Sequence, residues 1–144
     1  MFGEKNIIGE STIKVNKGRI IVPKFTYGEV DDNVLLMFSL MKNRLIIGQT
    51  DSMIKLLEKV EKEMIELGVN QGQPEFTYAR KVRRFLYATR CITEEKIDQQ
   101  RRILIPKNVM EELNFGSQVF VVGNQNRLDI YQNEEVYKKT LKNI

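Results

Sequence analysis

The sequence predicts a β-rich α+β fold built from one unit that occurs twice along the chain. Two pairs of matching segments predict the duplication. Lys17-Gly-Arg-Ile-Ile-Val-Pro-Lys24 recurs as Gln100-Arg-Arg-Ile-Leu-Ile-Pro-Lys107, and Asn43-Arg-Leu-Ile-Ile-Gly-Gln49 recurs as Asn126-Arg-Leu-Asp-Ile-Tyr-Gln132. Both matches have the same offset of 83 positions, which is hard to obtain by chance and indicates an internal repeat. We refer to the two occurrences as copy one and copy two.

Each copy is expected to contain a short strand that ends at a proline. Ile20–Val22 and Ile103–Ile105 are apolar runs followed directly by proline, which is typical of buried strands. In copy two, residues 106–113 place three apolar side chains on one face and predict a short helix. The segment Asn114–Ser117 should end that helix, with Gly116 free to adopt a positive φ.

The rest of each copy should be a hairpin. In copy two, Val119–Val122 and the alternating segment Arg127–Tyr131 predict two strands, the second half-buried, joined by a turn over residues 123–126. Copy one follows the same order, with strands at 34–38 and 45–47. Its central helix should be weaker, because residues 25–28 contain poor helix formers and a glycine.

Helices are expected between and after the copies. Ser52–Leu67 has apolar residues at three- and four-residue spacing, with Asp51 as its N-cap and Gly68 as its stop. A second helix is predicted over about 75–88, and a short one near 134–141. The expected organisation is a first repeat with its helix over 7–68, a linker and basic helix over 69–89, and a second repeat with a C-terminal helix over 90–144.

The composition disfavours most enzymes. The chain has no histidine and one cysteine, Cys91, so imidazole-dependent triads and most zinc sites are excluded. It contains neither of the common glycine-rich phosphate-binding motifs. We therefore expect a protein that is not an enzyme and has no cofactor, metal ion or small-molecule substrate. A lone thiol, no secretory signal and no long apolar run predict a cytoplasmic location without a membrane partner.

Basic residues are concentrated in one part of the chain. Residues 80–107 hold nine Lys or Arg against three Asp or Glu, whereas residues 1–79 hold ten against eleven. Such a run can simply be a solvated surface. Its position beside the repeated strand of copy two favours a polyanionic partner, because neutralisation of phosphates supplies most of the non-specific affinity for DNA.

The motif Ile97-Asp-x-x-x-Arg102-Ile-Leu-Ile-Pro106, followed by a short helix, a glycine loop and a valine-rich strand, resembles the AbrB superfamily of swapped-hairpin DNA-binding domains. Two copies in one chain resemble the MraZ family of bacterial regulators, encoded at the head of the division and cell-wall gene cluster. Ile8–Glu10 and the arginine-rich segment Tyr78–Ala88 also lie where that family has similar features. The resemblance extends from about residue 7 to about residue 137.

The resemblance implies a pseudo-twofold β-barrel-like core with flanking helices, assembled into a ring-like homo-oligomer. It also implies a nucleoid-associated regulator that binds double-stranded DNA and represses its own operon from short direct repeats about one helical turn (~10 bp) apart. Arg19 and Arg102 would contact bases, since a guanidinium pairs bidentately with guanine, and Asp98 would hold the strand that carries Arg102. The remaining predicted DNA-binding residues are Lys17, Lys24, Arg101, Lys107, Arg80, Arg83 and Arg84. A salt bridge to a neighbouring helix is the alternative role for the two base-reading arginines.

Copy one departs from the family pattern. The family carries an Asp four residues before the arginine, where an ungapped alignment puts Val15 and a one-residue deletion puts Asn16. In copy two, Arg101 replaces a family glycine, which adds a charge and removes positive-φ freedom. Two other functions therefore stay open. One is a toxin-neutralising antitoxin of the same superfamily, and the other is a ring-forming assembly protein that has lost DNA binding.

Overall fold

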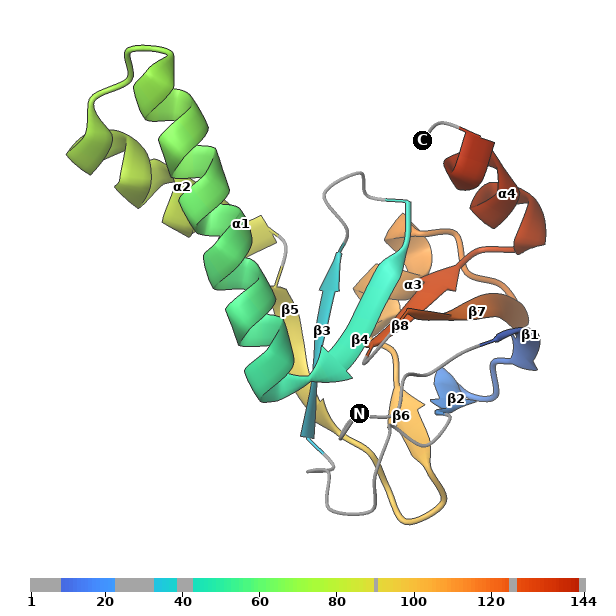
Figure 1. Ribbon diagram of the computed structural model, residues 1–144. Coiled ribbons are helices and arrows are strands. Elements are labelled where there is room, and N and C mark those ends of the chain that lie inside the picture. Colours follow the sequence, from blue (N-terminus) through green and yellow to red (C-terminus); the bar gives the residue numbers. More distant parts are fainter. Residues whose placement is uncertain (1–8, 23–32, 39–42, 90, 125–126, 143–144) are drawn as a thin grey trace, which may run out of the picture.

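The computed structural model describes residues 9–22, 33–38, 43–89, 91–124 and 127–142 (Figure 1). Within these residues the chain forms eight β-strands and four α-helices. In chain order they are β1 (Glu10–Lys14), β2 (Arg19–Ile21), β3 (Asn33–Phe38), β4 (Leu45–Gln49), α1 (Thr50–Asn70), α2 (Glu75–Thr89), β5 (Cys91–Lys96), β6 (Arg102–Leu104), α3 (Lys107–Glu112), β7 (Gln118–Asn124), β8 (Arg127–Tyr131) and α4 (Glu134–Lys142).

Six strands form one antiparallel sheet in which the two copies exchange their first strands. The strand order is β1-β7-β8-β4-β3-β5, so β1 of copy one pairs with the hairpin of copy two, and β5 of copy two pairs with the hairpin of copy one. The remaining strands, β2 and β6, pair with each other and form a two-stranded sheet, here called the ribbon. This reciprocal exchange confirms the expected swapped-hairpin, barrel-like core.

A pseudo-twofold axis relates the copies. In the ribbon, Ile20 lies opposite Ile103, and between β4 and β8, Ile46 lies opposite Asp129. The residues of each pair are 83 positions apart, the offset of the sequence repeat. Equivalent residues can face each other only where a twofold axis passes between their strands. The axis therefore runs through the centre of the ribbon and through the middle of the six-stranded sheet.

The main core fills the space between the sheet, the ribbon and α3. It contains inward residues of both copies, including the axial pair Ile20 and Ile103, together with Val109 of α3. A second cluster lies between β3, β4 and the first turns of α1, where Met53 and Leu57 cover Ile46. The sheet thus has a protein layer on both faces beside β4, and its position relative to the ribbon is set by apolar packing.

The repeated arginine of the second motif has a structural role. Arg44 lies just before β4, and its Nε atom is 3.5 Å from Oδ2 of Asp129, a buried carboxylate of β8. The guanidinium also lies over the ring of Tyr131, 5.7 Å from the ring centre. A buried charge is tolerated when it has a charged or hydrogen-bonding partner, and this ion pair joins the two copies close to the pseudo-twofold axis.

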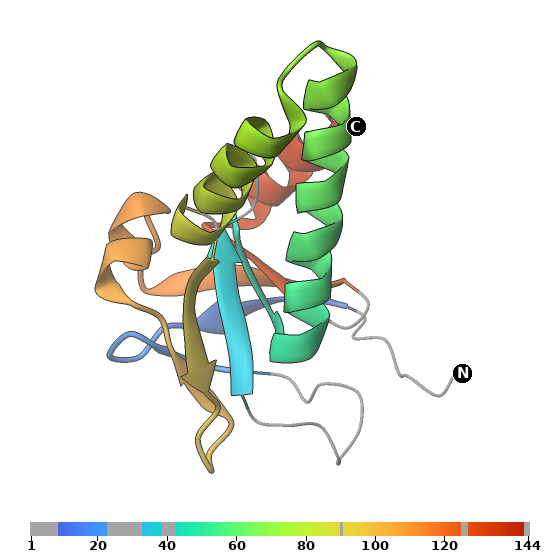
Figure 2. The same ribbon diagram turned by 90° about the vertical axis from the view of Figure 1, so that its left-hand side faces the viewer.

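α1 and α2 form an antiparallel helical hairpin that projects from the barrel (Figures 1 and 2). α1 extends beyond the predicted bounds at both ends. The prediction that Asp51 is its N-cap was wrong: the N-cap is Gln49, which makes no side-chain capping bond. Asp51 lies in the first turn, where a carboxylate still interacts favourably with the helix dipole.

Gly68 was expected to end α1, and this prediction was also wrong. Gly68 lies inside the helix, and a Cβ atom at this position would collide with the ring of Tyr78 in α2. The turn after the helix instead contains Gly72, with a φ of 88°. Glycine is needed at position 68 because two helices approach closely there, and at position 72 because the backbone adopts a left-handed conformation.

α3 ends as a Schellman motif. The N–H of Asn114 donates to the carbonyl of Glu111, and the N–H of Phe115 donates to that of Met110. The left-handed residue is Asn114, with a φ of 54°, so the assignment of that role to Gly116 was wrong. Asparagine tolerates this conformation better than most residues, which makes it a workable stop for the helix.

α4 covers the outer face of β7 and β8. The ring of Tyr137 lies 5.4 Å from that of Phe120 and 5.1 Å from that of Tyr131, and its hydroxyl donates to Glu10 at 3.0 Å. Burial raises the pKa of both tyrosines. With α4 on one face and the main core on the other, β8 is buried from Leu128 to Tyr131 rather than half-buried as predicted.

The weak helix expected over residues 25–28 lies outside the described residues. In the part of the chain that the structure describes, no helix is long and apolar enough to cross a membrane. The same residues contain no group of three or more Asp, Glu, Cys or His side chains placed to hold a metal ion.

Candidate nucleic-acid interface

The ribbon has one buried face and one exposed face. Ile20 and Ile103 point into the core and are each 1% exposed, whereas Ile21 is 60% and Leu104 is 42% exposed. The prediction that both triplets are buried strands was therefore half wrong. Successive side chains of a strand alternate between its two faces, and a run of three apolar residues does not reveal that one face is open. Arg19 and Arg102 share the exposed face with the outward apolar residues.

Turn one, residues Asn16–Arg19, connects β1 to β2. The N–H of Asn16 donates to the carbonyl of Arg19 at 2.9 Å, and the N–H of Arg19 donates back at 3.0 Å. The two residues between them, Lys17 and Gly18, have φ values of 53° and 76°. A two-residue loop with both φ angles positive matches the twist of a hairpin. The tight loop holds Lys17 at the exposed end of the ribbon.

Turn two, residues Asp98–Arg102, is one residue longer. The N–H of Asp98 donates to the carbonyl of Arg102 at 2.9 Å, and the N–H of Arg101 donates to the carbonyl of Asp98 at 3.0 Å. Arg101 has a φ of 63°, the left-handed position that closes a three-residue hairpin loop. A left-handed backbone at a non-glycine residue costs about 1–2 kcal/mol. The backbone at Arg101 would therefore accommodate glycine, the residue of the family pattern, at a lower cost than arginine.

The backbone hydrogen bonds of the two turns show which residue of copy one corresponds to Asp98 of copy two. The N–H of Asn16 donates to the carbonyl of Arg19, just as the N–H of Asp98 donates to the carbonyl of Arg102. Asn16 is therefore the counterpart of Asp98, and the loop of turn one is one residue shorter. Val15 then corresponds to Ile97, and both pack against the main core. The reading that puts Val15 in place of the aspartate does not hold in three dimensions.

Asp98 anchors turn two through both carboxylate oxygens. Oδ1 accepts the N–H of Gln100 at 2.9 Å and that of Arg102 at 2.8 Å, and Oδ2 accepts Nε–H of Arg102 at 2.9 Å. The backbone bond from Arg102 is the main reason that the pKa of Asp98 lies below its usual value. These bonds fix the start of β6 and the direction of the Arg102 side chain. The salt bridge of Arg102 is thus to its own turn and not to a helix.

The arginine of copy one, Arg19, has different surroundings. Among the described residues, no ion pair involves Arg19, which lies on the exposed face beside Leu104. Of the predicted phosphate contacts, Lys17 and Lys107 are exposed at one end of the ribbon, and Arg101 is half-buried in turn two at the other end. Lys24 lies outside the described residues. The ribbon and its turns therefore bring together five of the predicted basic residues.

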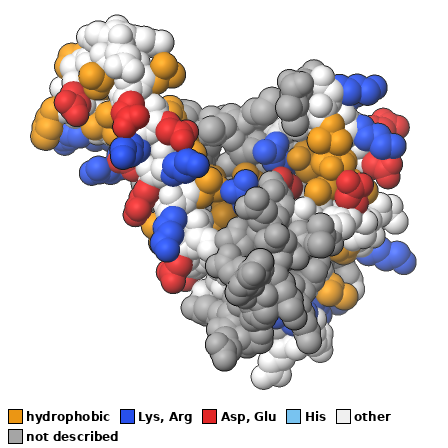
Figure 3. All heavy atoms as spheres, viewed as in Figure 1, with side chains coloured by type: hydrophobic (Ala, Val, Ile, Leu, Met, Phe, Trp, Pro, Cys, Tyr) orange, Lys and Arg blue, Asp and Glu red, His pale blue; other side chains and the backbone are white. Residues whose placement is uncertain are grey.

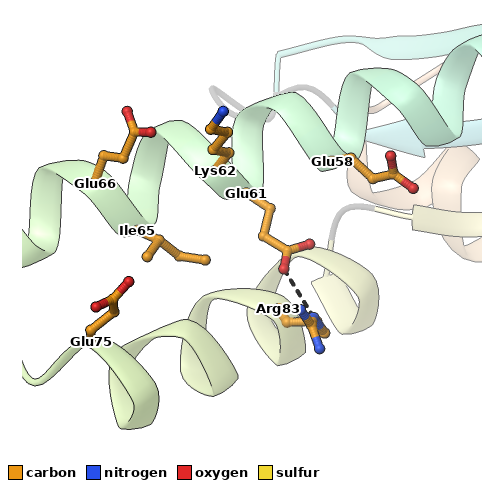
Figure 4. Close-up of a pocket in the computed structure, with 7 residues that line it drawn as sticks. All are labelled: Glu58, Glu61, Lys62, Ile65, Glu66, Glu75 and Arg83. Atoms are coloured by element: carbon orange, nitrogen blue, oxygen red, sulfur yellow. Dashed lines mark hydrogen bonds and ion pairs between the residues drawn. The ribbon is translucent and has the colours of Figure 1, made fainter.

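Arg80, Arg83 and Arg84 lie on α2, and the structure does not bring them to the ribbon. The helical hairpin and the ribbon occupy opposite ends of the molecule (Figures 1 and 2). Nε of Arg83 is 2.9 Å from Oε1 of Glu61 in α1. The two residues belong to a groove between the helices that is also lined by Glu58, Lys62, Ile65, Glu66 and Glu75 (Figure 4).

The helical hairpin is electrostatically mixed. α1 carries five acidic and three basic residues, and α2 carries one acidic and four basic residues. Basic and acidic side chains are interspersed along the exposed side of α1 (Figure 3). The groove in Figure 4 contains four carboxylates against two cations. The charge excess of α2 is thus partly balanced by α1, which the sequence run alone did not reveal.

Comparison with known proteins agrees with this architecture. A protein of Caldicellulosiruptor saccharolyticus named "Transcriptional regulator MraZ" is 30% identical over 129 residues, which cover 89% of this chain and 82% of the relative. The chain belongs to the MraZ family. A protein of the same name from Caldicellulosiruptor bescii is 29% identical over 134 residues, covering 92% of this chain and 85% of the relative.

The family model described as "MraZ protein, putative antitoxin-like" matches residues 90–144. This segment is copy two, which includes the Asp98–Arg102 anchor and the three-residue turn. Copy one is the half with the shorter turn and with asparagine in place of the anchoring aspartate. The family pattern is therefore clearer in copy two than in copy one, and the MraZ relatives nevertheless align along most of the chain.

Proposed function

We propose that this MraZ protein is a transcriptional regulator that binds double-stranded DNA with the exposed face of the ribbon. The observation that carries the proposal is that Arg19 and Arg102, one from each copy, lie on the same exposed face around the pseudo-twofold axis. A two-stranded ribbon fits into the major groove, and arginine is suited to guanine because its two N–H groups match O6 and N7. MraZ relatives carry the name of transcriptional regulators, which supports the same conclusion.

The surrounding charges fit this role. Lys17 in turn one and Lys107 after β6 lie at the same end of the ribbon, where the N–H of Ile105 donates to the carbonyl of Gly18 at 2.8 Å, and they can contact phosphates on that side of the groove. Arg101 in turn two lies at the opposite end, where the N–H of Val22 donates to its carbonyl at 2.7 Å, and can contact phosphates on the other side; we include Lys24 on the sequence repeat alone. Phosphate contacts position the protein, whereas base contacts select the sequence. We accordingly assign base reading to Arg19 and Arg102, and positioning of the Arg102 side chain to Asp98.

The proposed target is a set of short direct repeats about one helical turn apart (~10 bp) in the promoter of the protein's own operon, bound by a ring of protomers. A single ribbon is too small to specify a promoter. Two side chains on neighbouring strands are separated by only about 5–8 Å, which is about two base-pair steps. Several protomers that each read one element would supply the missing specificity. Repression would follow from occupation of the promoter on the nucleoid.

Electrophoretic mobility of the protein with DNA from just upstream of its own gene tests the proposal. The wild type should bind this DNA more tightly than a scrambled duplex, and the double variant Arg19→Ala/Arg102→Ala should lose that preference. A matched control is Lys55→Ala/Lys59→Ala, which removes the same charge from exposed positions of α1, away from the ribbon. Equal binding of the wild type to both duplexes would contradict sequence-specific DNA binding and would favour an antitoxin or an assembly protein.

A further inference from the structure

The exposed face of the ribbon carries two large apolar side chains beside its arginines. Ile21 is 60% exposed and Leu104 is 42% exposed, and the two residues are equivalent in the repeat, 83 positions apart. In the cross-strand register Leu104 lies opposite Arg19, and Ile21 lies opposite Arg102. Each arginine therefore has an apolar neighbour that comes from the other copy. The face consists of two such mixed pairs, related by the pseudo-twofold axis.

Neither apolar side chain is needed for the core. The inward positions of the ribbon are filled by Ile20 and Ile103, each 1% exposed, so Ile21 and Leu104 add little to burial. Threonine would satisfy the strand at these positions equally well and would be compatible with water. Leu104 lies over turn one, where a Cβ atom added at Gly18 would be 3.4 Å from its Cδ1 atom. Exposed apolar residues at both equivalent positions therefore indicate contact with a partner.

We propose that Ile21 and Leu104 contact thymine methyl groups in the major groove, each beside a guanine read by the arginine of the opposite copy. This inference rests on the DNA-binding function proposed above. The thymine C5-methyl is the apolar group that the major groove offers, and apolar side chains recognise it by contact. The four positively charged residues Lys17, Arg19, Arg102 and Lys107 near this face make DNA the partner that fits its charge.

The dimensions of the ribbon agree with adjacent bases. Residues that lie opposite each other on antiparallel strands have Cβ atoms about 4.5–5.5 Å apart. Base pairs of B-DNA are stacked at about 3.4 Å, so an arginine and its cross-strand neighbour can reach the same or the next base pair. Each mixed pair would then read a guanine and a thymine side by side. Discrimination would depend on Arg19 together with Leu104, and on Arg102 together with Ile21.

The test removes the methyl group from the DNA and shortens the apolar side chain on the protein. In a duplex that the wild type binds specifically, each thymine of the bound element is replaced in turn by deoxyuridine, which differs only by the missing methyl group. Loss of one buried methyl contact should weaken wild-type binding about four-fold at the thymines that are read. Leu104→Ala should be insensitive to deoxyuridine at one of these positions, and Ile21→Ala at another. Ile21→Thr, which keeps a methyl group, should retain part of the sensitivity.

Three outcomes would overturn the inference. If the wild type binds specifically but deoxyuridine has no effect at any position, or if both alanine variants stay as sensitive as the wild type, the thymine contacts are absent while DNA binding stands. If Ile21→Ala and Leu104→Ala change the sedimentation of the free protein, this face is a contact between protein chains. If the wild type binds no duplex specifically, the proposed function fails together with the inference. Thermal unfolding of each variant checks that the fold is kept.

Discussion

The carboxylate of Asp98 holds Arg102 by both its backbone N–H, at 2.8 Å, and its guanidinium Nε–H, at 2.9 Å. The corresponding residues of copy one, Asn16 and Arg19, keep the backbone bonds of the turn without an ion pair among the described residues. The two copies therefore present their arginines differently, although the strands beneath them are related by the pseudo-twofold axis. Several expectations follow from this difference and from the packing around it.

The first concerns specificity. Arg102→Ala should reduce the preference for the cognate duplex over a scrambled one by roughly 1–3 kcal/mol, the value of a lost bidentate base contact. Arg19→Ala should reduce this preference less, because among the described residues no ion pair fixes the direction of the Arg19 side chain. Titration of both variants against both duplexes at one salt concentration measures the difference. Equal loss of specificity would show that Asn16 orients Arg19 as well as Asp98 orients Arg102.

The second concerns pH. Because the folded state lowers the pKa of Asp98, this group stabilises the protein above the usual pKa of aspartate, and its contribution disappears as the pH falls through the lowered value. Asp98→Asn should therefore be less stable than the wild type at pH 7, with a gap that closes in acid. Chemical denaturation at pH 7 and at several values below pH 4 measures this gap. A constant difference across that range would mean that the charge of Asp98 is irrelevant to stability.

The third concerns the helical hairpin. Gly68→Ala should lower the free energy of unfolding by about 1–3 kcal/mol, because the added methyl group forces the ring of Tyr78 out of its place. Gly116→Ala is the matched control, since Gly116 has no atom within 4 Å of the added Cβ and no positive φ. That control should be neutral or slightly stabilising, by up to about 1 kcal/mol, through the unfolded state. Similar losses in both variants would contradict the close approach of α1 and α2.

The fourth concerns the salt dependence of DNA binding. Substitution of Lys17 and Lys107 by alanine should reduce the slope of log K against log salt by about 0.9 for each phosphate contact that is lost. The sequence run assigns similar contacts to Arg80, Arg83 and Arg84. Because α2 lies far from the ribbon and Arg83 pairs with Glu61, we expect the triple variant of these arginines to leave the slope unchanged. A flattened slope would place α2 of a bound protomer on DNA.

The fifth concerns assembly. The outer end of the helical hairpin exposes three apolar side chains. Phe76 is 79% exposed, Leu67 is 60% exposed and Val69 is 36% exposed. Burial of such a patch favours association of protomers, so the protein should sediment as an oligomer at micromolar concentration. Phe76→Asp should shift it to smaller species, whereas Leu141→Asp, at an exposed position of α4, should not. A monomeric wild type would contradict the ring.

Much of the fold could be predicted because each repeat is recognisable from patterns of residues that are close in the sequence. The helices α2, α3 and α4 and the hairpin strands of both copies lie within a few residues of the predicted positions. β1 was missed, since Glu10–Lys14 is mostly polar and exposed and has no alternation to reveal it. The exchange of β1 and β5 between the copies depends on long-range pairing, and only the family resemblance predicted it.

The details of the site were less predictable. The deletion in turn one shifts the alignment by one residue, and only the hydrogen bonds of Asn16 show where the gap lies. The exposure of Ile21 and Leu104 depends on which face of the ribbon lies over the core, and a continuous apolar triplet does not specify it. Glu61 falls between the apolar positions of the predicted helix, yet it is buried against Arg83 because α2 folds back onto α1.

The exchange of first strands means that neither copy is a complete folding unit. A polypeptide ending near residue 73 would hold a hairpin that lacks β5, and one beginning near residue 74 would hold a hairpin that lacks β1. Each fragment carries the edge strand that the other needs, so two fragments made as separate chains should reassemble when mixed. The connection through the helical hairpin turns such an assembly of two similar halves into one molecule. Joined in this way, the halves do not have to be identical, and one carries a carboxylate beside its arginine while the other carries an asparagine.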